Sequence, residues 1–451
     1  MFKEGLKKLI MTTVACAAVS ASAALPQPQH IVEGIKSYEL ENGLKIVLFA
    51  DQSKPTATVN TTYLVGSRQE NYGETGMAHL LDPLLFKGSE NYPDPTREFT
   101  KRGFRMNGTT WLDRTNYFVS FTANDDNMRW ALGWSADAMV NSNIAQKDLD
   151  TEMTVVRNEY EMGENKPVSV MVKRMQGILF DWHAYGRNTI GARSDIENVP
   201  IENLQAFYHK WYQPDNAVLT VSGKFDETKV LTWITETFGK IPRPTRVLPA
   251  EWTVEPVADG PRYFEIRRPG ESQLVAVGYR IPSAIAADNN AVETAVDVLS
   301  SAPRGRLYKA LVETGMAGQV FGWAMSAKCP SFVMFGAMVK KGDDIERVKN
   351  VLIDTVENAF KKTPADETEV GLSLAEAATD FERTLSDPEE FAVELSDYIS
   401  LGDWRLYFYD RDATAKVTPA DVNKAAATYF VRDNRAVGVF IPDDKPQRAP
   451  Y

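Results

Sequence analysis

The stretch GMAHLLDPLLFKGS, residues 76–89, places a histidine and an acid three residues apart. Side chains at positions i and i+3 lie on one face of a helix, so we expect His79 and Asp82 to be neighbours. A second histidine at i+4 would complete a pair of zinc ligands. Pro83 stands at that position, and proline offers no side-chain donor to a metal. The stretch therefore has the spacing of a metal site but lacks one ligand.

Strands and helices alternate around this stretch. Residues 35–66 alternate apolar and polar side chains, and Asn42-Gly43 predicts a hairpin between two strands. A helical period begins near Thr75, and residues 107–123 have the pattern of strands again. Two further helices are predicted at residues 130–142 and 149–164. The sequence therefore predicts a mixed α/β or α+β architecture.

A proline-rich segment at residues 241–262 divides the chain into halves of similar size. It contains five prolines and no helical period, which is typical of a linker. We therefore predict an N-terminal domain over residues 30–242, which carries the His79 motif, and a C-terminal domain over residues 262–451.

The ends of the two halves resemble each other. The segment PIENLQAFYHKWYQPDNAVLTVSG (200–223) has a counterpart in PADVNKAAATYFVRDNRAVGVFIP (419–442). Each has a proline that opens a helix, an aromatic pair near the end of that helix, an Asp-Asn turn and a β-rich strand. Their similar position in each half predicts a duplicated domain.

The first 23 residues have the pattern of a secretory signal peptide. A basic start is followed by an apolar run at residues 9–19 and by small residues at 21–23. The run is shorter than the roughly 20 residues that a bilayer-spanning helix needs. We therefore expect an exported, periplasmic protein. An ordinary N-terminal helix and a lipid anchor at Cys16 are the alternatives that remain open.

Charge and composition exclude some partners. The formal net charge of −11 leaves no electrostatic footprint for nucleic acid or an anionic membrane surface. The apolar fraction of 43% is typical of a globular chain with a large core, and we expect no transmembrane segment in the mature chain. Signal cleavage would leave Cys329 as the only cysteine, so the core must stabilise the fold without a disulfide framework.

The chain resembles the pitrilysin/insulinase family of zinc metallopeptidases, which includes mitochondrial processing peptidase. The resemblance covers nearly the whole mature chain. It rests on ENGLKIVLFAD (41–51), GSRQENYGETGMAHLLDPLLFKGSENYP (66–93), NGTTWLDRTNY (107–117), DLDTEMTVVRNEYEMGENKP (148–167), HAYGRNTIGARSDIENV (183–199), FYHKWYQPDNAVLTVSGKFD (207–226) and RGRLYKALVETGMA (304–317).

The resemblance implies an inverted zinc motif, His-x-x-Glu-His, on a helix. In the family both histidines bind zinc, the glutamate between them is the general base, and a distal glutamate on a second helix is the third ligand. By this resemblance His79 matches the first ligand, Asp82 stands at the base position and Pro83 replaces the second histidine. Glu159 matches the distal ligand, and Glu152 matches an acid that supports the site.

The family fold consists of two similar domains, each a mostly antiparallel sheet covered by helices, that form half of a clamshell. Two such units enclose unfolded peptides, which bind by adding a strand to a sheet edge. The substrate-binding segment of the family corresponds to Asn107, Gly108, Thr109 and Thr110, although a turn before a purely structural strand is an equal alternative. The family also holds the substrate carbonyl with an arginine and a tyrosine, and the resemblance places Leu311 and Gly318 there.

The departures from the family pattern decide the predicted function. Two protein ligands fall short of the three that catalytic zinc usually has. Pro83 costs about 3 kcal/mol in a helix interior, so we expect it to kink or end the helix and to displace His79. Asp82 is one methylene shorter than glutamate, and misplacing a carboxylate by roughly 1 Å can cost about 100-fold in rate.

We therefore expect a pseudoenzyme with a degenerate zinc motif and no cofactor. It would be a non-catalytic subunit that pairs with a zinc-bearing relative in a heterodimer, or with a second copy, and forms part of a chamber for unfolded peptides. One alternative is an active zinc metalloendopeptidase that uses His79, Asp82 and Glu159 as ligands. The other is a structural, core-like subunit of a larger assembly.

Overall fold

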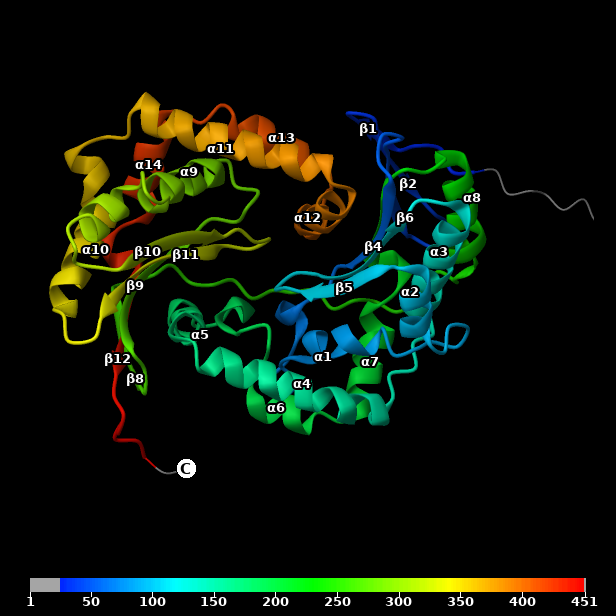
Figure 1. The fold of residues 1–451 in the computed structure, drawn as a ribbon, viewed down its shortest axis with the longest axis horizontal. Helices are drawn as coiled ribbons and strands as arrows, with labels where there is room; N and C mark the ends of the chain where they lie inside the picture. The colour runs from blue at the N-terminus through cyan, green and yellow to red at the C-terminus, as the bar shows by residue number, and fades with distance from the viewer. Residues whose placement is uncertain (1–24, 450–451) are drawn as a thin grey trace, which may run out of the picture.

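Two β-sheets, one from each half of the chain, form the frame of the molecule (Figure 1). The computed structural model describes residues 25–449, so the predicted signal peptide and Cys16 lie outside the described residues. The first sheet has the strand order β1 (His30–Val32), β2 (Ile35–Glu39), β3 (Lys45–Ala50), β7 (Ala217–Gly223), β4 (Thr56–Tyr63), β6 (Thr115–Thr122) and β5 (Arg105–Thr110). The second has the order β10 (Gln319–Met325), β11 (Ser331–Lys340), β9 (Ser272–Ile281), β12 (Arg435–Pro442) and β8 (Arg262–Arg268).

Helices follow the strands in both halves. Those of the first half are α1 (Met77–Leu84), α2 (Pro95–Arg102), α3 (Asp125–Val140), α4 (Gln146–Glu164), α5 (Pro167–Leu179), α6 (Arg193–Asn198), α7 (Ile201–Trp211) and α8 (Glu227–Thr237). Those of the second half are α9 (Asn289–Ser300), α10 (Ile345–Lys362), α11 (Glu367–Ser386), α12 (Pro388–Leu401), α13 (Leu406–Thr414) and α14 (Pro419–Tyr429). Between residues 25 and 449, none of the helices combines the length and the apolar character of a membrane span.

The two sheets share one topology, which confirms the predicted duplication and the mostly antiparallel α+β fold. The order β3-β7-β4-β6-β5 in the first sheet corresponds to β8-β12-β9-β11-β10 in the second. In each case the last strand of the half, β7 or β12, lies between one parallel and one antiparallel neighbour. The segments 200–223 and 419–442 both fold as a helix, a short 3₁₀ turn and this strand.

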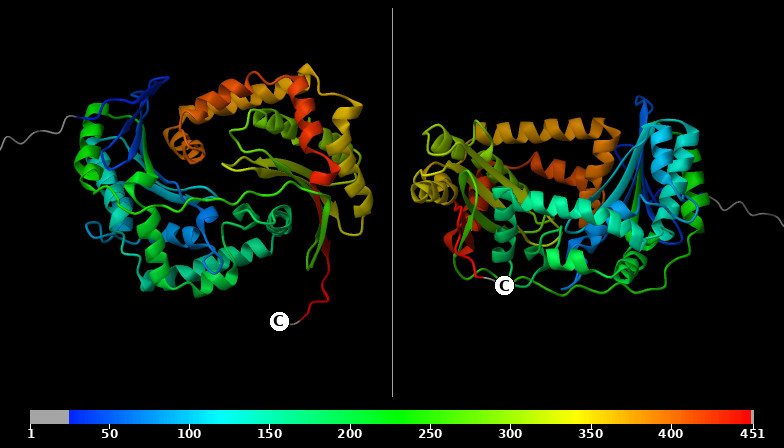
Figure 2. Two further views of the ribbon diagram at one scale, coloured as in Figure 1. Left: turned by 180° about the vertical axis from the view of Figure 1, so that it is seen from behind. Right: turned by 60° about the horizontal axis from the view of Figure 1, so that its bottom comes forward.

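The turn and linker signals in the sequence correspond to turns and a linker. Asn42-Gly43 lies in the connection between β2 and β3, which pair antiparallel, and Gly43 has a φ of 95°, a conformation that favours glycine. Residues 242–260 form no helix or strand. Figure 2 shows this segment running along the outside of the molecule between the two sheets. The chain therefore crosses from the first sheet to the second along the surface.

The central strands of the second sheet are buried on both faces. Along β11, Val333, Phe335 and Ala337 pack into the core that α9, α10 and α14 form. Phe332 and Met334 point to the opposite face and pack into the core that contains α5. Because side chains alternate between the faces of a strand, this two-sided burial produces a continuous apolar run rather than alternation.

Each half of the chain contributes a helix to the other half's sheet. Helix α5 lies against β9 and β12, where Gly278 allows it to approach, since a Cβ there would lie 2.6 Å from the Met175 sulfur. Helix α12 lies against β4 and β7 of the first sheet, and Phe391 and Leu395 share a buried cluster with Val47. Figure 1 shows both helices between the two sheets. The two halves therefore complete each other's hydrophobic cores.

Candidate active site

Helices α1 and α4 bring the first and distal predicted ligands together. His79 Nε2 lies 3.4 Å from Glu159 Oε2. The His79 side chain is 18% exposed, whereas that of Glu159 is 53% exposed, so the pair lies where α1 meets solvent. Burial alone would lower the pKa of His79, but the hydrogen bond to Glu159 and the charges of Glu159, Asp82 and Glu70 together raise it. His79 and Glu159 thus form a hydrogen-bonded pair in which the imidazole is mostly buried and the carboxylate is exposed to solvent.

Pro83 lies inside α1 without moving His79 away from its partner. The helix continues one residue past the proline, to Leu84, but it lacks the hydrogen bond that an N–H at position 83 would donate to the carbonyl oxygen of His79. The expected displacement of His79 is wrong, since its ring still contacts Glu159. The physical reason is that Pro83 lies in the last turn, so the turns that begin α1 keep their hydrogen bonds. Pro83 therefore removes a metal ligand from α1 but leaves the contact between α1 and α4 in place.

Asp82 points toward the edge strand β5. Thr110 Oγ1 donates to Asp82 Oδ2 at 3.3 Å. A Cβ at Gly108 would lie 2.0 Å from Asp82 Oδ1, so only glycine permits this approach of the carboxylate to the strand. Burial raises the pKa of Asp82 to about 6, although the charge of His79 opposes this shift. The acid at the base position therefore contacts the strand predicted to bind substrate.

The predicted supporting acid belongs to an ion pair. Glu152 Oε1 lies 2.5 Å from Lys87 Nζ, and its side chain is 14% exposed. Lys87 follows α1 in the chain and was not singled out by its sequence context. The pair therefore joins the segment after α1 to α4.

The donors around His79 do not fit a catalytic zinc ion. His79 and Glu159 offer two ligands, Pro83 offers none, and Glu152 is paired with Lys87. A metal-ligating histidine usually donates its second ring nitrogen to a partner, yet His79 Nδ1 is buried and has no hydrogen-bond partner among the described residues. Within residues 25–449, no three His, Cys, Asp or Glu side chains are grouped so that they could hold a metal ion.

Sequence reasoning missed Glu70, which fixes the start of α1. Its carboxylate accepts hydrogen bonds from the backbone N–H groups of Gly76 at 2.8 Å and Ala78 at 2.9 Å. These N–H groups have no partner within the helix, so an acid there acts as a cap. Glu70 lies outside the helix, six residues before Gly76, and therefore gives no capping signal in the sequence. Burial raises its pKa to about 7, despite these two bonds.

Replacing Glu70 by glutamine should change how stability depends on pH. Glu70 ionises near its ordinary value of 4.5 in the unfolded chain but only near 7 in the folded one. Between these values the unfolded state loses its proton first, so the native protein is destabilised as pH rises. We expect wild type to lose about 2 kcal/mol relative to Glu70→Gln between about pH 5 and about pH 8. Urea denaturation of both proteins at both pH values measures this, and parallel pH profiles would contradict it.

The predicted substrate-binding residues form an edge strand, not a turn. Asn107, Gly108, Thr109 and Thr110 lie in β5, which pairs with β6 on one side only. The N–H of Gly108 donates to its neighbour's side chain, Asn107 Oδ1, at 2.9 Å. Because N–H groups alternate in direction along a strand, those of Met106, Gly108 and Thr110 point away from β6. The edge therefore offers unpaired backbone donors in the sheet plane, and Asn107 covers one of them.

The residues aligned with the family's arginine and tyrosine do not line a site. Leu311 is fully buried in the core of the second half. Gly318 lies one residue before β10, where its N–H donates to the carbonyl oxygen of Met338. Leucine has no polar side-chain group and glycine has no side chain, so neither residue can replace the arginine or the tyrosine.

Comparison with known proteins places this arrangement in a family. A family model described as "Insulinase (Peptidase family M16)" matches residues 45–193, and one described as "Peptidase M16 inactive domain" matches residues 198–372. The zinc protease PqqE of Helicobacter pylori is 26% identical over 452 residues, which cover 97% of each chain. The probable zinc protease PqqL of Escherichia coli is 26% identical over 272 residues, which are 58% of this chain and 28% of that protein.

Solved structures share the fold. A protease from Helicobacter pylori superposes with a TM-score of 0.86 at 24% identity and covers 93% of this chain and 100% of that one. The periplasmic protease PqqL of Escherichia coli superposes with a TM-score of 0.74 at 17% identity and covers 92% of this chain but 48% of that one. The two family models meet near residue 195, between the helices of the His79–Glu159 pair and the second sheet. The duplicated half-clamshell, the matched sequence and the α1–α4 pair agree, and the chain belongs to peptidase family M16, the insulinase family.

Proposed function

We propose that this chain is a non-catalytic M16 protein that pairs with a zinc-bearing relative and forms one wall of a peptide-binding chamber. The observation that carries the proposal is Pro83 at a ligand position within a preserved scaffold. His79 and Glu159 still meet on their two helices, but the third donor is missing. The chain thus keeps the fold of an M16 peptidase but lacks the ligands for a catalytic zinc ion.

The size of the relatives supports pairing. The first half of PqqL superposes on this chain over 94% of its length, whereas the whole of PqqL is covered only to 48%. A chain of this size therefore corresponds to one of the two halves of PqqL, which supports pairing with a second unit of the same family. PqqL is a periplasmic protease, and together with the signal-like start of this chain this supports export to the periplasm.

Co-purification tests the pairing. The tagged chain should recover a family member that carries both motif histidines when the two are co-expressed, and the complex should elute at the mass of a heterodimer. Recovery of the chain only as a monomer, with no relative bound, would count against the proposal. If the chain elutes as a homodimer, the partner in the chamber is a second copy of this chain and not a zinc-bearing relative.

The edge of β5 is where a peptide would bind. An extended peptide can pair with the unpaired backbone groups of an edge strand and form one more strand of the sheet. Its side chains would then alternate between the α1 face, which carries Asp82, and the α12 face. Affinity from backbone hydrogen bonds is largely independent of sequence, which suits a chamber for unfolded peptides.

Met106→Pro should weaken peptide binding by about tenfold, because it removes one outward N–H and places a ring at the edge. Met106→Ala is the matched control, since it removes the same side chain but keeps the N–H. Fluorescence anisotropy with a labelled unfolded peptide measures both, on the chain alone and on its complex. Equal affinities of the two variants would show that β5 does not receive the peptide.

The second candidate is an active zinc metalloendopeptidase that uses His79, Asp82 and Glu159. It is favoured by the similarity to PqqE, a zinc protease whose match covers 97% of this chain. Metal analysis of the pure chain and a peptide-cleavage assay distinguish the two functions. One zinc ion per chain, with chelator-sensitive cleavage that disappears in Glu159→Gln, would establish the enzyme. If the chain assembles with a partner but binds no peptide, its role is that of a structural subunit in a larger assembly.

A further inference from the structure

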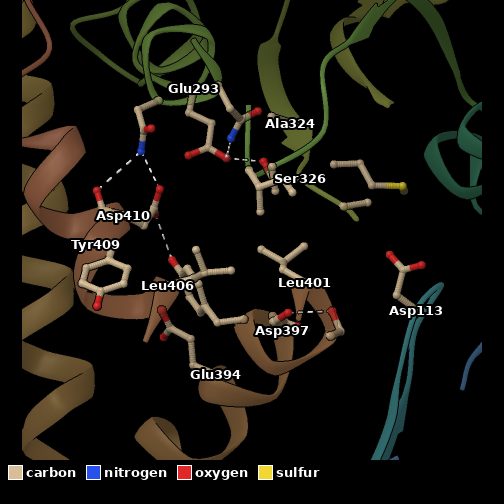
Figure 3. A pocket seen from close by; sticks show the side chains of 18 of the residues that line it. Asp113, Glu293, Ala324, Ser326, Glu394, Asp397, Leu401, Leu406, Tyr409 and Asp410 are labelled. Carbon is tan, nitrogen blue, oxygen red and sulfur yellow. Dashed lines mark hydrogen bonds between the residues drawn. The ribbon is translucent and has the colours of Figure 1, made fainter. Parts of the chain in front are cut away.

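A cavity of about 1120 Å³ opens between the two halves of the chain, away from His79. Its walls come from α9, from α12 and α13, and from the segment that joins β5 to β6. Figure 3 shows acidic side chains on several of these elements, among them Glu293 on α9, Glu394 on α12 and Asp410 on α13. The cavity is therefore assembled from segments that are far apart in the sequence.

The lining is strongly acidic. It contains Asp113, Glu293, Glu389, Glu390, Glu394, Asp397 and Asp410 but only one cationic side chain, Arg383. Four of these acids have a cationic partner: Glu390 pairs with Arg383, Asp397 with Arg114, Glu389 with Arg105 and Asp113 with Arg68. Among the described residues the remaining three, Glu293, Glu394 and Asp410, form no ion pair, although Arg383 lies close enough for its charge to act on Glu394.

The hydrogen-bond donors to two of these acids, Glu293 and Asp410, are neutral groups. Asp410 accepts hydrogen bonds from Asn290 Nδ2 at 2.5 Å and from the Tyr398 hydroxyl at 3.1 Å. Glu293 accepts from Asn289 Nδ2 at 3.1 Å and from the Ser326 hydroxyl. Burial raises the pKa of each of the three carboxyls. The protein alone therefore holds Glu293 and Asp410 without a compensating charge, which is unfavourable for a carboxylate.

An unsatisfied acceptor in the same wall points to a missing donor. Asn289 is 2% exposed and lines the cavity. Its Nδ2 donates to Glu293, but its Oδ1 is buried and accepts no hydrogen bond among the described residues. Buried polar atoms without a hydrogen-bond partner are rare in native proteins, so this oxygen is expected to accept a hydrogen bond from a bound molecule. Since the nearby acids also accept, the missing partner must offer several hydrogen-bond donors.

The remaining walls favour an organic cation over a metal ion. Trp111, Phe118, Val393 and Leu401 add aromatic and aliphatic surface to the cavity. Such surface suits the methylene stem of an amine or a guanidine, and an aromatic face attracts its charge. A hard metal ion would instead need several oxygens around one point, and no such group exists among residues 25–449.

We propose that this cavity binds an ammonium or guanidinium group. Its charge is placed between Glu293, Asp410 and Glu394, and one N–H is donated to Asn289 Oδ1. The group can belong to a free polyamine or to a lysine or arginine side chain. The second source rests on the proposed peptide binding at β5: Phe118 in the cavity wall lies opposite Asn107 in the β5–β6 ladder, and Arg105 at the start of β5 pairs with Glu389.

Calorimetry with the full chain tests the proposal, with spermidine as the free amine and an arginine-containing unfolded peptide as the second source. The variant Glu293→Gln/Asp410→Asn should bind spermidine at least about tenfold more weakly than wild type. Glu202→Gln, which removes an exposed acid from α7, is the control for net charge and should bind as wild type does. The double variant should melt no lower than wild type, because the acids it removes are unpaired.

The peptide arm separates the two sources. Replacing arginine by citrulline should weaken binding of the peptide to wild type but not to the double variant. Met106→Pro should lower affinity for the peptide and leave affinity for spermidine unchanged, so failure at β5 and failure of the cavity give different results. Equal spermidine binding by wild type and the double variant, or Mg²⁺ binding that displaces spermidine from the cavity, would overturn the proposal.

Discussion

The double variant Asp82→Glu/Pro83→His should bind one zinc ion per chain, whereas wild type should hold none after dialysis against a weak chelator. Position 83 lies four residues after His79, on the same face of α1, so the new imidazole joins the existing contact between His79 and Glu159. This completes three protein ligands. Metal analysis of both proteins by mass spectrometry measures the difference.

The gain should exceed about 100-fold in affinity, because even a supporting partner of a metal ligand is worth about 10–100-fold. The scaffold requires little rearrangement, since His79 already contacts Glu159. Histidine at position 83 also restores an N–H that can donate to the carbonyl oxygen of His79, so α1 should gain one hydrogen bond. The substitution therefore adds a ligand and a helix hydrogen bond at once, and the controls must separate the two effects.

Asp82→Glu/Pro83→Ala repairs the helix without adding a ligand, and it should stay free of zinc. Adding Glu159→Gln to the zinc-binding variant should abolish binding, because it removes the distal carboxylate. If wild type and the alanine variant hold zinc as tightly as the histidine variant, position 83 does not control the metal, and the proposed loss of catalysis is wrong.

Local signals in the sequence predicted much of the fold. The Asn42-Gly43 turn joins β2 to β3, and the similar segments 200–223 and 419–442 mark the ends of two domains with one topology. These features depend on residues that are close in sequence, where turn chemistry and periodicity act directly. The contact between His79 and Glu159 was accessible only through the family resemblance, because the two helices have no local signal for each other.

Features assembled from distant segments could not be predicted in this way. Glu70 caps a helix that it does not belong to. Glu293, Glu394 and Asp410 lie on three helices of the second half and meet the segment after β5 of the first half. Each of these acids by itself resembles a solvated surface charge, and only the packing of α9, α12 and α13 against the segment after β5 brings them into one cavity. Long-range packing, not local propensity, forms the acidic cavity.

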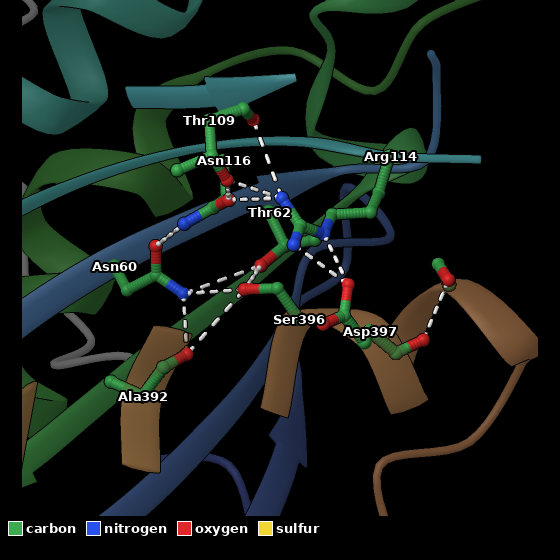
Figure 4. Close-up of polar contacts among 9 residues, drawn as sticks. Asn60, Thr62, Thr109, Arg114, Asn116, Ala392, Ser396 and Asp397 are labelled. Carbon is green, nitrogen blue, oxygen red and sulfur yellow. Dashed lines mark hydrogen bonds and ion pairs between the residues drawn. The ribbon is translucent and has the colours of Figure 1, made fainter. Parts of the chain in front are cut away.

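Asn60→Ala should destabilise the protein by about 3–5 kcal/mol, because it leaves several buried polar groups without partners. Asn60 is fully buried in β4 and donates to the carbonyl oxygen of Ala392 at 2.7 Å and to Ser396 Oγ at 2.9 Å, both on α12. It also accepts from Asn116 Nδ2 at 2.9 Å on β6 (Figure 4). Urea denaturation measures the loss. Thr58→Val is the control on the same strand, because Thr58 bonds only Ser120 there, and it should cost about 1 kcal/mol.

The same network connects α12 to the edge of the sheet, so its loss should reach further than stability. Arg114 donates to Asn116 Oδ1 and to Asp397 on α12, and it also bonds Thr109 of β5. In a double-mutant cycle, Asn60→Ala and Ser396→Ala should be non-additive by about 1–2 kcal/mol, because they remove the same bond. Asn60→Ala should also weaken spermidine binding, since α12 carries Glu394. Additive losses, with spermidine affinity unchanged, would show that α12 is held by its apolar face alone and that the buried polar network does not position it.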